Sequence, residues 1–147
     1  MTTEIRKKLS ANDVGATGGH QAGILVPKEE QILSFFPTLD KTVKNPRMKL
    51  VVFERESRER WEFNFIYYNN KLFKEGAGKG TRNEYRITGM TKFMRAIDAK
   101  VDDVLVFSRD ENASFEVDIV RSNASFSLQM DGDTLVLGGG WTVIPSR

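Results

Sequence analysis

The second half of the chain is a series of short strand-like runs, separated by turn signals every eight to twelve residues. These runs cover residues 101–110, 114–122, 125–130, 133–139 and 141–146. The first two form a predicted hairpin. Short strands at this spacing favour a β-sandwich or a β-barrel.

Alternation of apolar and polar side chains predicts further strands in the first half. Between residues 59 and 70, Trp61, Phe63 and Phe65 alternate with polar residues, which is the period of a strand with one buried face. Ser57 and Arg58 mark a turn between this strand and the preceding one. The other predicted strands of this half are residues 23–26, 48–56 and 84–88.

Two short helices are expected between these strands. The first starts at Pro27 and ends before Pro37, with acidic residues in its first turn that suit the helix dipole. The second covers residues 90–99. The predicted inward side chains are Ile32, Leu33, Phe35 and Phe36 in the first helix and Phe93, Met94 and Ile97 in the second.

The composition is that of one ordinary globular domain. The chain has 147 residues, of which 39% are hydrophobic, enough for a normal core. It has no cysteine and one histidine, which excludes disulfides, thiolate metal sites and multi-histidine metal sites. No apolar run is long enough to span a membrane, and no signal peptide is evident. We therefore expect a soluble cytoplasmic protein.

The charge is distributed unevenly along the chain. Residues 1–100 carry 19 basic and 12 acidic side chains, whereas residues 101–147 carry 3 basic and 8 acidic ones. Residues 71–100 alone have a net charge of +5. A local basic excess suits a polyanionic partner, although a solvated basic face would look the same.

Two polar segments are candidates for arms that contact nucleic acid. Residues 7–23 (KKLSANDVGATGGHQAG) are rich in hydrogen-bonding groups and in glycine, and we expect them to add nothing to the core. In residues 79–88 (KGTRNEYRIT), Arg82, Glu84 and Arg86 alternate and would project to one side of an extended chain. Arginine pairs with guanine and glutamate with cytosine in the major groove. Charges paired across an exposed strand are the alternative explanation.

Other chemistries find weaker support. The run GAGKGT (76–81) lacks the spacing of a phosphate-binding loop, and no βαβ unit surrounds it. Asp98 and Lys100 have the spacing of a metal-dependent nuclease motif, but they lie at a predicted helix end without an acidic strand partner. His20 lacks the partners of a nucleophilic triad, and a DNA contact or a structural hydrogen bond would suit it equally.

Three sequence stretches resemble a known family. Residues 9–23 (LSANDVGATGGHQAG) and 67–88 (YYNN…KGTRNEYRIT) are similar to the two DNA-gripping arms of the effector domain of EcoRII-type (type IIE) restriction endonucleases. Residues 102–120 resemble a strand–turn–strand unit of the plant B-three-type DNA-binding pseudobarrel. The resemblance implies one domain over residues 1–147, a mainly β, seven-stranded open pseudobarrel with two short helices.

The resemblance also implies a function. Such a domain is expected to be a bacterial, monomeric, non-catalytic module that binds double-stranded 5′-CCWGG (W is A or T) through an N-arm (about 7–23) and a C-arm (about 79–88) in the major groove. It would need no cofactor or metal of its own. The family's Mg²⁺-dependent catalytic site belongs to a separate C-terminal nuclease domain, which would be its partner.

The matched arm positions give the expected site residues. Base-reading residues are expected to be Asn12, Asp13, Thr17, His20, Gln21, Arg82, Asn83, Glu84 and Arg86. Backbone-binding residues are expected to be Lys7, Lys8, Ser10, Gly18, Gly19, Lys79, Thr81 and Tyr85. Tyr85 stands where the family has a basic residue, which suggests a stacking or sugar contact instead of a phosphate contact.

Three other functions remain open from the sequence. The chain could be a self-sufficient endonuclease, which magnesium-dependent cleavage would reveal. It could be a transcription-factor domain of the same fold that recognises another site. It could also be a β-barrel that binds a protein or a small ligand and has no affinity for DNA at moderate salt.

Overall fold

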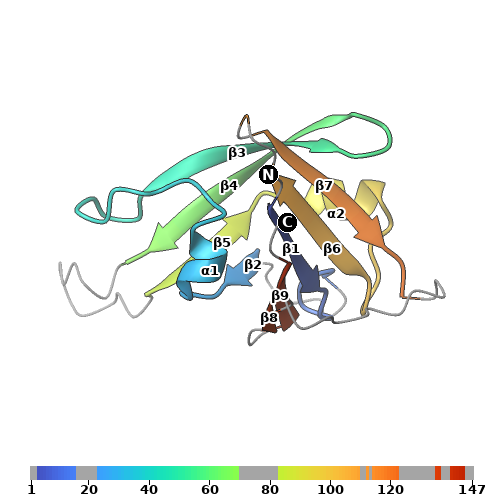
Figure 1. The fold of residues 1–147 in the computed structure, drawn as a ribbon, viewed down its shortest axis with the longest axis horizontal. Helices are drawn as coiled ribbons and strands as arrows, with labels where there is room; N and C mark the ends of the chain where they lie inside the picture. The colour runs from blue at the N-terminus through green and yellow to red at the C-terminus, as the bar shows by residue number, and fades with distance from the viewer. Residues whose placement is uncertain are drawn as a thin grey trace.

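A curled β-sheet forms the body of the molecule (Figure 1). The computed structural model describes residues 3–15, 23–69, 83–109, 112, 114–122, 135–136 and 140–144. The strands are β1 (Thr3–Lys8), β2 (Ile24–Val26), β3 (Arg47–Glu54), β4 (Arg60–Tyr68), β5 (Glu84–Thr88), β6 (Val104–Arg109), β7 (Phe115–Val120), β8 (Leu135–Val136) and β9 (Trp141–Ile144). The helices are α1 (Glu30–Leu33) and α2 (Thr91–Ala96).

The strand order is β2-β5-β4-β3-β7-β6-β1-β9-β8. All neighbours are antiparallel except β3 and β7, which are parallel. The mainly β architecture with two short helices is confirmed, although the described residues contain nine strands instead of seven. The predicted strand at 125–130 lies outside the described residues.

The curl brings the two ends of the sheet together. The indole Nε1 of Trp141 in β9 donates a hydrogen bond to the carbonyl oxygen of Leu25 in β2 at 2.9 Å. β2 is the terminal strand at one end of the sheet, and β9 is the second strand from the other end. Because the Trp141 side chain is fully buried, this bond closes the sheet through its interior.

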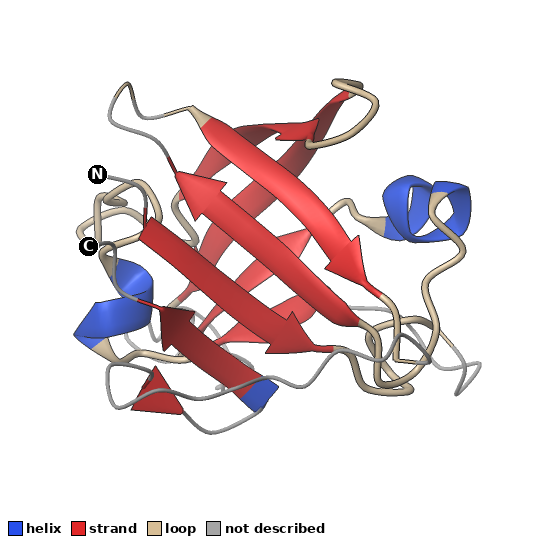
Figure 2. Ribbon diagram, turned by 45° about the vertical axis from the view of Figure 1, so that its right-hand side comes forward, coloured by secondary structure: helices blue, strands red, loops and turns tan. Residues whose placement is uncertain are grey.

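Aromatic side chains fill the inside of the curl. Phe36, just after α1, stacks on Phe65 of β4 with ring centroids 4.7 Å apart. Phe93 of α2 meets Trp61 and Phe63 of β4 edge to face, at 5.3 Å in each case. The two helices lie to the left and to the right of the strands in Figure 2, and they contact different aromatic residues of β4, so each covers a different part of the core.

The first strand departs from the sequence expectations. Residues 3–8 are not among the strands predicted from the sequence, but they form β1, which lies between β6 and β9. Among residues 4–8, whose burial is described, Ile5 and Lys7 are buried, so a polar composition conceals an interior strand of the sheet. Leu9, which the sequence places in the N-arm, is also part of the core.

The first helix is shorter than expected. It was predicted from Pro27 to Phe36, whereas α1 covers Glu30–Leu33. The guanidinium of Arg109 donates hydrogen bonds to the carbonyl oxygens of Ser34 and Phe35 at 3.3 and 3.1 Å. These bonds satisfy carbonyls at the helix end and hold Phe35 and Phe36 in the core. Within the described part of the chain, no helix is long and apolar enough to cross a membrane.

Candidate nucleic-acid interface

The two predicted arms join the sheet at opposite ends of one strand pair. β2 and β5 pair with Leu25 opposite Arg86 and Val26 opposite Tyr85. The N-arm therefore enters β2 at Gly23, level with Thr88 at the end of β5. Residues 84–88 of the predicted C-arm form β5 itself, and the rest of that arm joins β5 at Asn83. These levels are five residues apart along β5, or about 17 Å at about 3.3 Å per residue. The face of β2 and β5 forms a floor between the arms.

The β2–β5 pair packs one face against the core and leaves the other face, the floor, open to solvent. Ile24, Val26, Tyr85 and Ile87 are buried, whereas Leu25 is 47% exposed. Because residues directly opposite each other in an antiparallel pair project to the same face, Leu25 and Arg86 share the outward face. This alternation places an arginine and a leucine side by side between the arms.

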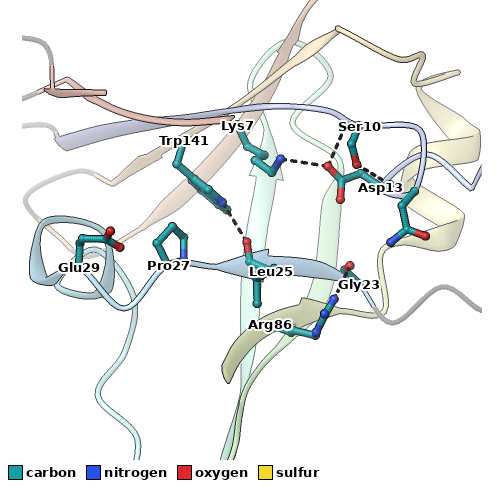
Figure 3. A pocket seen from close by; sticks show the side chains of 10 residues that line it. Lys7, Ser10, Asp13, Gly23, Leu25, Pro27, Glu29, Arg86 and Trp141 are labelled. Carbon is teal, nitrogen blue, oxygen red and sulfur yellow. Dashed lines mark hydrogen bonds and ion pairs between the residues drawn. The ribbon is translucent and has the colours of Figure 1, made fainter. Parts of the chain in front are cut away.

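A pocket of about 470 Å³ lies where this floor meets β1 and β9 (Figure 3). Most of its wall is apolar, and Leu25, Pro27 and Trp141 supply the larger apolar groups. The lining residues are Lys7, Ser10, Asn12, Asp13, Gly23, Leu25, Pro27, Glu29, Arg86 and Trp141. Both described ends of the N-arm therefore border the pocket.

A buried ion pair holds the start of the N-arm. Asp13 Oδ2 lies 3.2 Å from Lys7 Nζ, and both side chains are almost fully buried. The same oxygen accepts a hydrogen bond from the Ser10 backbone N–H at 2.9 Å, and Ser10 Oγ accepts one from the Asp13 N–H at 3.2 Å. Residues 10–13 thus form a compact turn with an internal charge pair.

This arrangement changes the expected roles of two residues. Lys7 was expected to bind phosphate and Asp13 to read a base. Here the Lys7 ammonium also donates to the carbonyl oxygen of Lys8 at 2.9 Å. Because the two charges face each other, their geometry suits a brace for the N-arm. Lys8, in contrast, exposes its side chain and remains available for phosphate.

Glu84 and the sequence-distant Gly23 carbonyl orient Arg86. Its Nε and Nη2 donate to the Glu84 carboxylate at 3.2 and 3.4 Å, and its Nη1 donates to the Gly23 carbonyl at 3.3 Å. The projection of Glu84 and Arg86 to one side agrees with the sequence prediction. Their pairing also agrees with the alternative of charges paired along an exposed strand. Arg82 lies outside the described residues.

The C-arm enters β5 through an aromatic stack. The Tyr85 ring is 6% exposed and stacks on Tyr67 at 4.3 Å and on Phe65 at 5.6 Å. A stacking contact between Tyr85 and DNA does not fit this placement, because the side chain is buried and its ring already stacks on two aromatic residues of β4. Asn83 accepts a hydrogen bond from the Tyr67 hydroxyl at 2.5 Å, which ties the C-arm to β4.

The structure brings together part of the predicted site. Six predicted residues lie around the floor and pocket, namely Lys7, Ser10, Asn12, Asp13, Glu84 and Arg86. Eight lie outside the described residues: Thr17, Gly18, Gly19, His20, Gln21, Lys79, Thr81 and Arg82. Sequence reasoning missed Leu25 and Trp141. No local sequence pattern marks either residue, because Leu25 lies within an apolar run and the contact that joins the two spans 116 positions.

Asp103, which follows α2, links the segment after that helix to the residues after β7. Asp103 accepts hydrogen bonds from the backbone N–H groups of Ser122 and Lys100, both at 2.9 Å, and from the Arg121 guanidinium at 3.1 Å. Burial acts to raise the pKa of Asp103, but these donors together hold the pKa below its usual value. Across the described residues, no group of three or more His, Cys, Asp or Glu side chains could hold a metal ion.

Solved structures define the class of fold. The chain is similar to the B3 domain of the UbaLAI restriction endonuclease, solved with cognate DNA, with 20% identity, a TM-score of 0.61 and coverage of 99% of this chain and 87% of that one. Arabidopsis FUS3 in a DNA complex gives 15% identity and a TM-score of 0.58, with 79% and 94% coverage. The N-terminal domain of Helicobacter pylori LlaJI.R1 gives 14% identity and 0.58, with both chains fully covered. The fold is a B3-type pseudobarrel.

Sequence comparison gives the family. Residues 2–125 match the model of the restriction endonuclease EcoRII N-terminal domain, and the chain belongs to this family. It is 44% identical over 85 residues to the type II restriction enzyme EcoRII of Escherichia coli. That match covers 56% of this chain and 19% of the enzyme's length.

Proposed function

We propose that this chain is a sequence-specific effector domain that binds double-stranded 5′-CCWGG without cleaving it. Its N-arm and C-arm enter the major groove from the two ends of the β2–β5 floor. The proposal draws on the family and on the DNA complexes of the UbaLAI and FUS3 domains. The parent protein would be a type II restriction endonuclease whose separate nuclease domain uses Mg²⁺.

The distance between the two arm entry points is the main structural support for the proposal. The entry points at Gly23 and Asn83 are separated by five residue steps along β5, or about 17 Å. Five base pairs at about 3.4 Å each also span about 17 Å of duplex axis. Arms at this separation reach the two ends of a five-base-pair site, so each arm can contact one half of CCWGG.

The floor supplies an oriented base reader. Arg86 is fixed by Glu84 and by the Gly23 carbonyl, which reduces the side-chain entropy lost when it binds. An arginine fork matches guanine O6 and N7, and a glutamate accepts from cytosine N4. On binding, the pair exchanges part of its mutual contact for adjacent guanine and cytosine edges. Asn12, which lines the pocket, would read a base edge in the other half.

Phosphate contacts would come mainly from the arms. Lys8, at the start of the N-arm, exposes its side chain, and Lys79, Thr81, Gly18 and Gly19 belong to the segments proposed to follow the DNA backbone. Such contacts position the domain and carry no base information. We propose that the domain is monomeric, with one face engaged per site.

Replacing guanine by 7-deazaguanine removes one acceptor from the major groove and leaves base pairing intact, so it tests groove use. A fluorescence titration should show weaker binding when either half-site guanine pair is replaced. Equal affinity for the modified and unmodified duplexes would exclude readout at guanine N7. A parallel incubation with Mg²⁺ should leave both strands whole, whereas cleavage would favour a self-sufficient endonuclease.

A further inference from the structure

Leu25 is an apolar side chain that shares its outward strand face with a charged pair. It is 47% exposed in the middle of β2, between buried Ile24 and Val26. Its neighbours on the outward face are charged, since Arg86 lies directly opposite it and Glu84 pairs with Arg86. The Leu25 main chain is fixed by the ladder to β5 and by the hydrogen bond from Trp141. The side chain therefore projects from a rigid strand.

The position of Leu25 along the floor is central. The arm entry points lie at the levels of Asn83 and Thr88, and Leu25 lies at the level of Arg86 between them. If the arms contact the two ends of a five-base-pair site, the middle of the floor faces the middle base pair. This step rests on the proposed function, because it assumes that the bound site is CCWGG with W as its central base pair.

We propose that Leu25 contacts the thymine C5-methyl group of the central A·T pair and so contributes to the preference for W. The thymine methyl is an apolar feature of the major groove, and apolar side chains contact it. A leucine has no donor or acceptor with a fixed direction, so it can meet the methyl on either strand. That property suits a position where A·T and T·A are both accepted and G·C is not.

Replacing the central thymine by uracil removes only the methyl group. Wild-type protein should bind a CCTGG duplex about fourfold more tightly than the uracil duplex, the fold-change expected for one buried methyl-sized group. In Leu25→Ala, affinity for the thymine duplex should fall and the difference between the two duplexes should disappear. Leu25→Met should keep the difference, because its side chain is also apolar and of similar length.

Val101→Ala is the matched control, because Val101 is 41% exposed and does not line the pocket. This variant should keep the fourfold difference. A wild-type protein that binds both duplexes equally would overturn the role of Leu25 while leaving the domain's site preference intact. An undiminished uracil effect in Leu25→Ala would do the same. Equal binding of CCTGG and scrambled DNA would instead overturn the proposed function, and the role of Leu25 with it.

Discussion

Trp141 and Leu25 are 116 positions apart in the sequence, yet the indole of one donates a 2.9 Å hydrogen bond to the carbonyl of the other. This bond joins β9 to β2 where the two ends of the curled sheet meet, which we call the seam. It fixes the strand that follows the N-arm and carries Leu25. The seam and the proposed DNA-binding floor are therefore one structural unit.

Trp141→Phe should lower the free energy of unfolding by about 1–3 kcal/mol, because the donor to a partly buried carbonyl is lost. It should also weaken specific DNA binding, because β2 is less firmly held. Urea unfolding and a DNA titration measure the two effects.

Trp61→Phe is the control for this variant. Trp61 Nε1 is buried and has no hydrogen-bond partner among the described residues, so its removal breaks no bond of this kind. The edge-to-face contact of the ring with Phe93 can persist. If both variants lost equal stability, ring volume alone would explain the effect and the seam bond would carry none of it.

Asp13→Asn should destabilise the protein by about 3–5 kcal/mol, because it leaves the buried Lys7 ammonium without its carboxylate. Adding Lys7→Met should recover part of the loss, since the uncompensated charge is then removed. Chemical unfolding of the two single variants and the double variant measures this coupling. If the stability lost by the double variant equalled the sum of the losses of the two single variants, a direct ion pair would be contradicted.

The exposed pair Lys8–Asp102 is a comparison for the buried pair. Its charged atoms are 3.7 Å apart and both side chains are 60% exposed. Lys8→Met should therefore change stability by no more than about 0.5 kcal/mol. The same change should weaken binding to all DNA sequences and reduce the salt dependence of that binding, because Lys8 is proposed to contact phosphate.

Gly23→Ala should disrupt the entry of the N-arm into β2. Gly23 has φ of +84°, and an added Cβ would lie 2.2 Å from the carbonyl oxygen of Ile87. Gly89 also has a positive φ, but there the nearest atom is a flexible side-chain nitrogen at 3.3 Å. Gly89→Ala should cost about 1–2 kcal/mol of stability from backbone strain, and Gly23→Ala clearly more. Thermal unfolding measures the stability of the two variants. Equal losses of stability would show that β2 can shift away from Ile87 without additional strain.

Arg86→Ala should reduce discrimination between CCWGG and scrambled DNA by about 1–3 kcal/mol, as expected for loss of one bidentate base contact. Binding to scrambled DNA should change little. Arg95→Ala removes the same charge from an exposed position of α2 and should leave discrimination unchanged. Competition titrations measure both variants, and a uniform loss for Arg86→Ala would make it a phosphate contact.

Asp103 should make stability depend on pH in the acid range. Its pKa is lower in the folded protein than the usual value of 3.8. Its contribution is therefore complete above about pH 4 and is lost as the pH falls through the folded-state pKa. Asp103→Asn should be less stable than wild type at pH 6, and the difference should shrink towards pH 2. Asp98→Asn, at a position with an 80% exposed side chain, should show a smaller change.

The sequence was most informative where one face of a strand is buried. β5 was predicted from 84 to 88 and has these bounds, because Tyr85 and Ile87 alternate with polar residues. β1 was missed because Lys7 occupies an inward position, and only the fold supplies its partner Asp13. Leu25 and Trp141 were missed as site residues for a similar reason: their importance comes from a long-range contact that no local pattern encodes.

Competition binding at near-physiological salt with Mg²⁺ tests the central claim most directly. The purified chain would be titrated with a short duplex containing CCWGG and with a scrambled duplex of the same composition. We expect a preference of about a thousandfold or more for the CCWGG duplex, with both strands intact. Equal, weak binding to the two duplexes would contradict it and would leave only a non-specific basic surface.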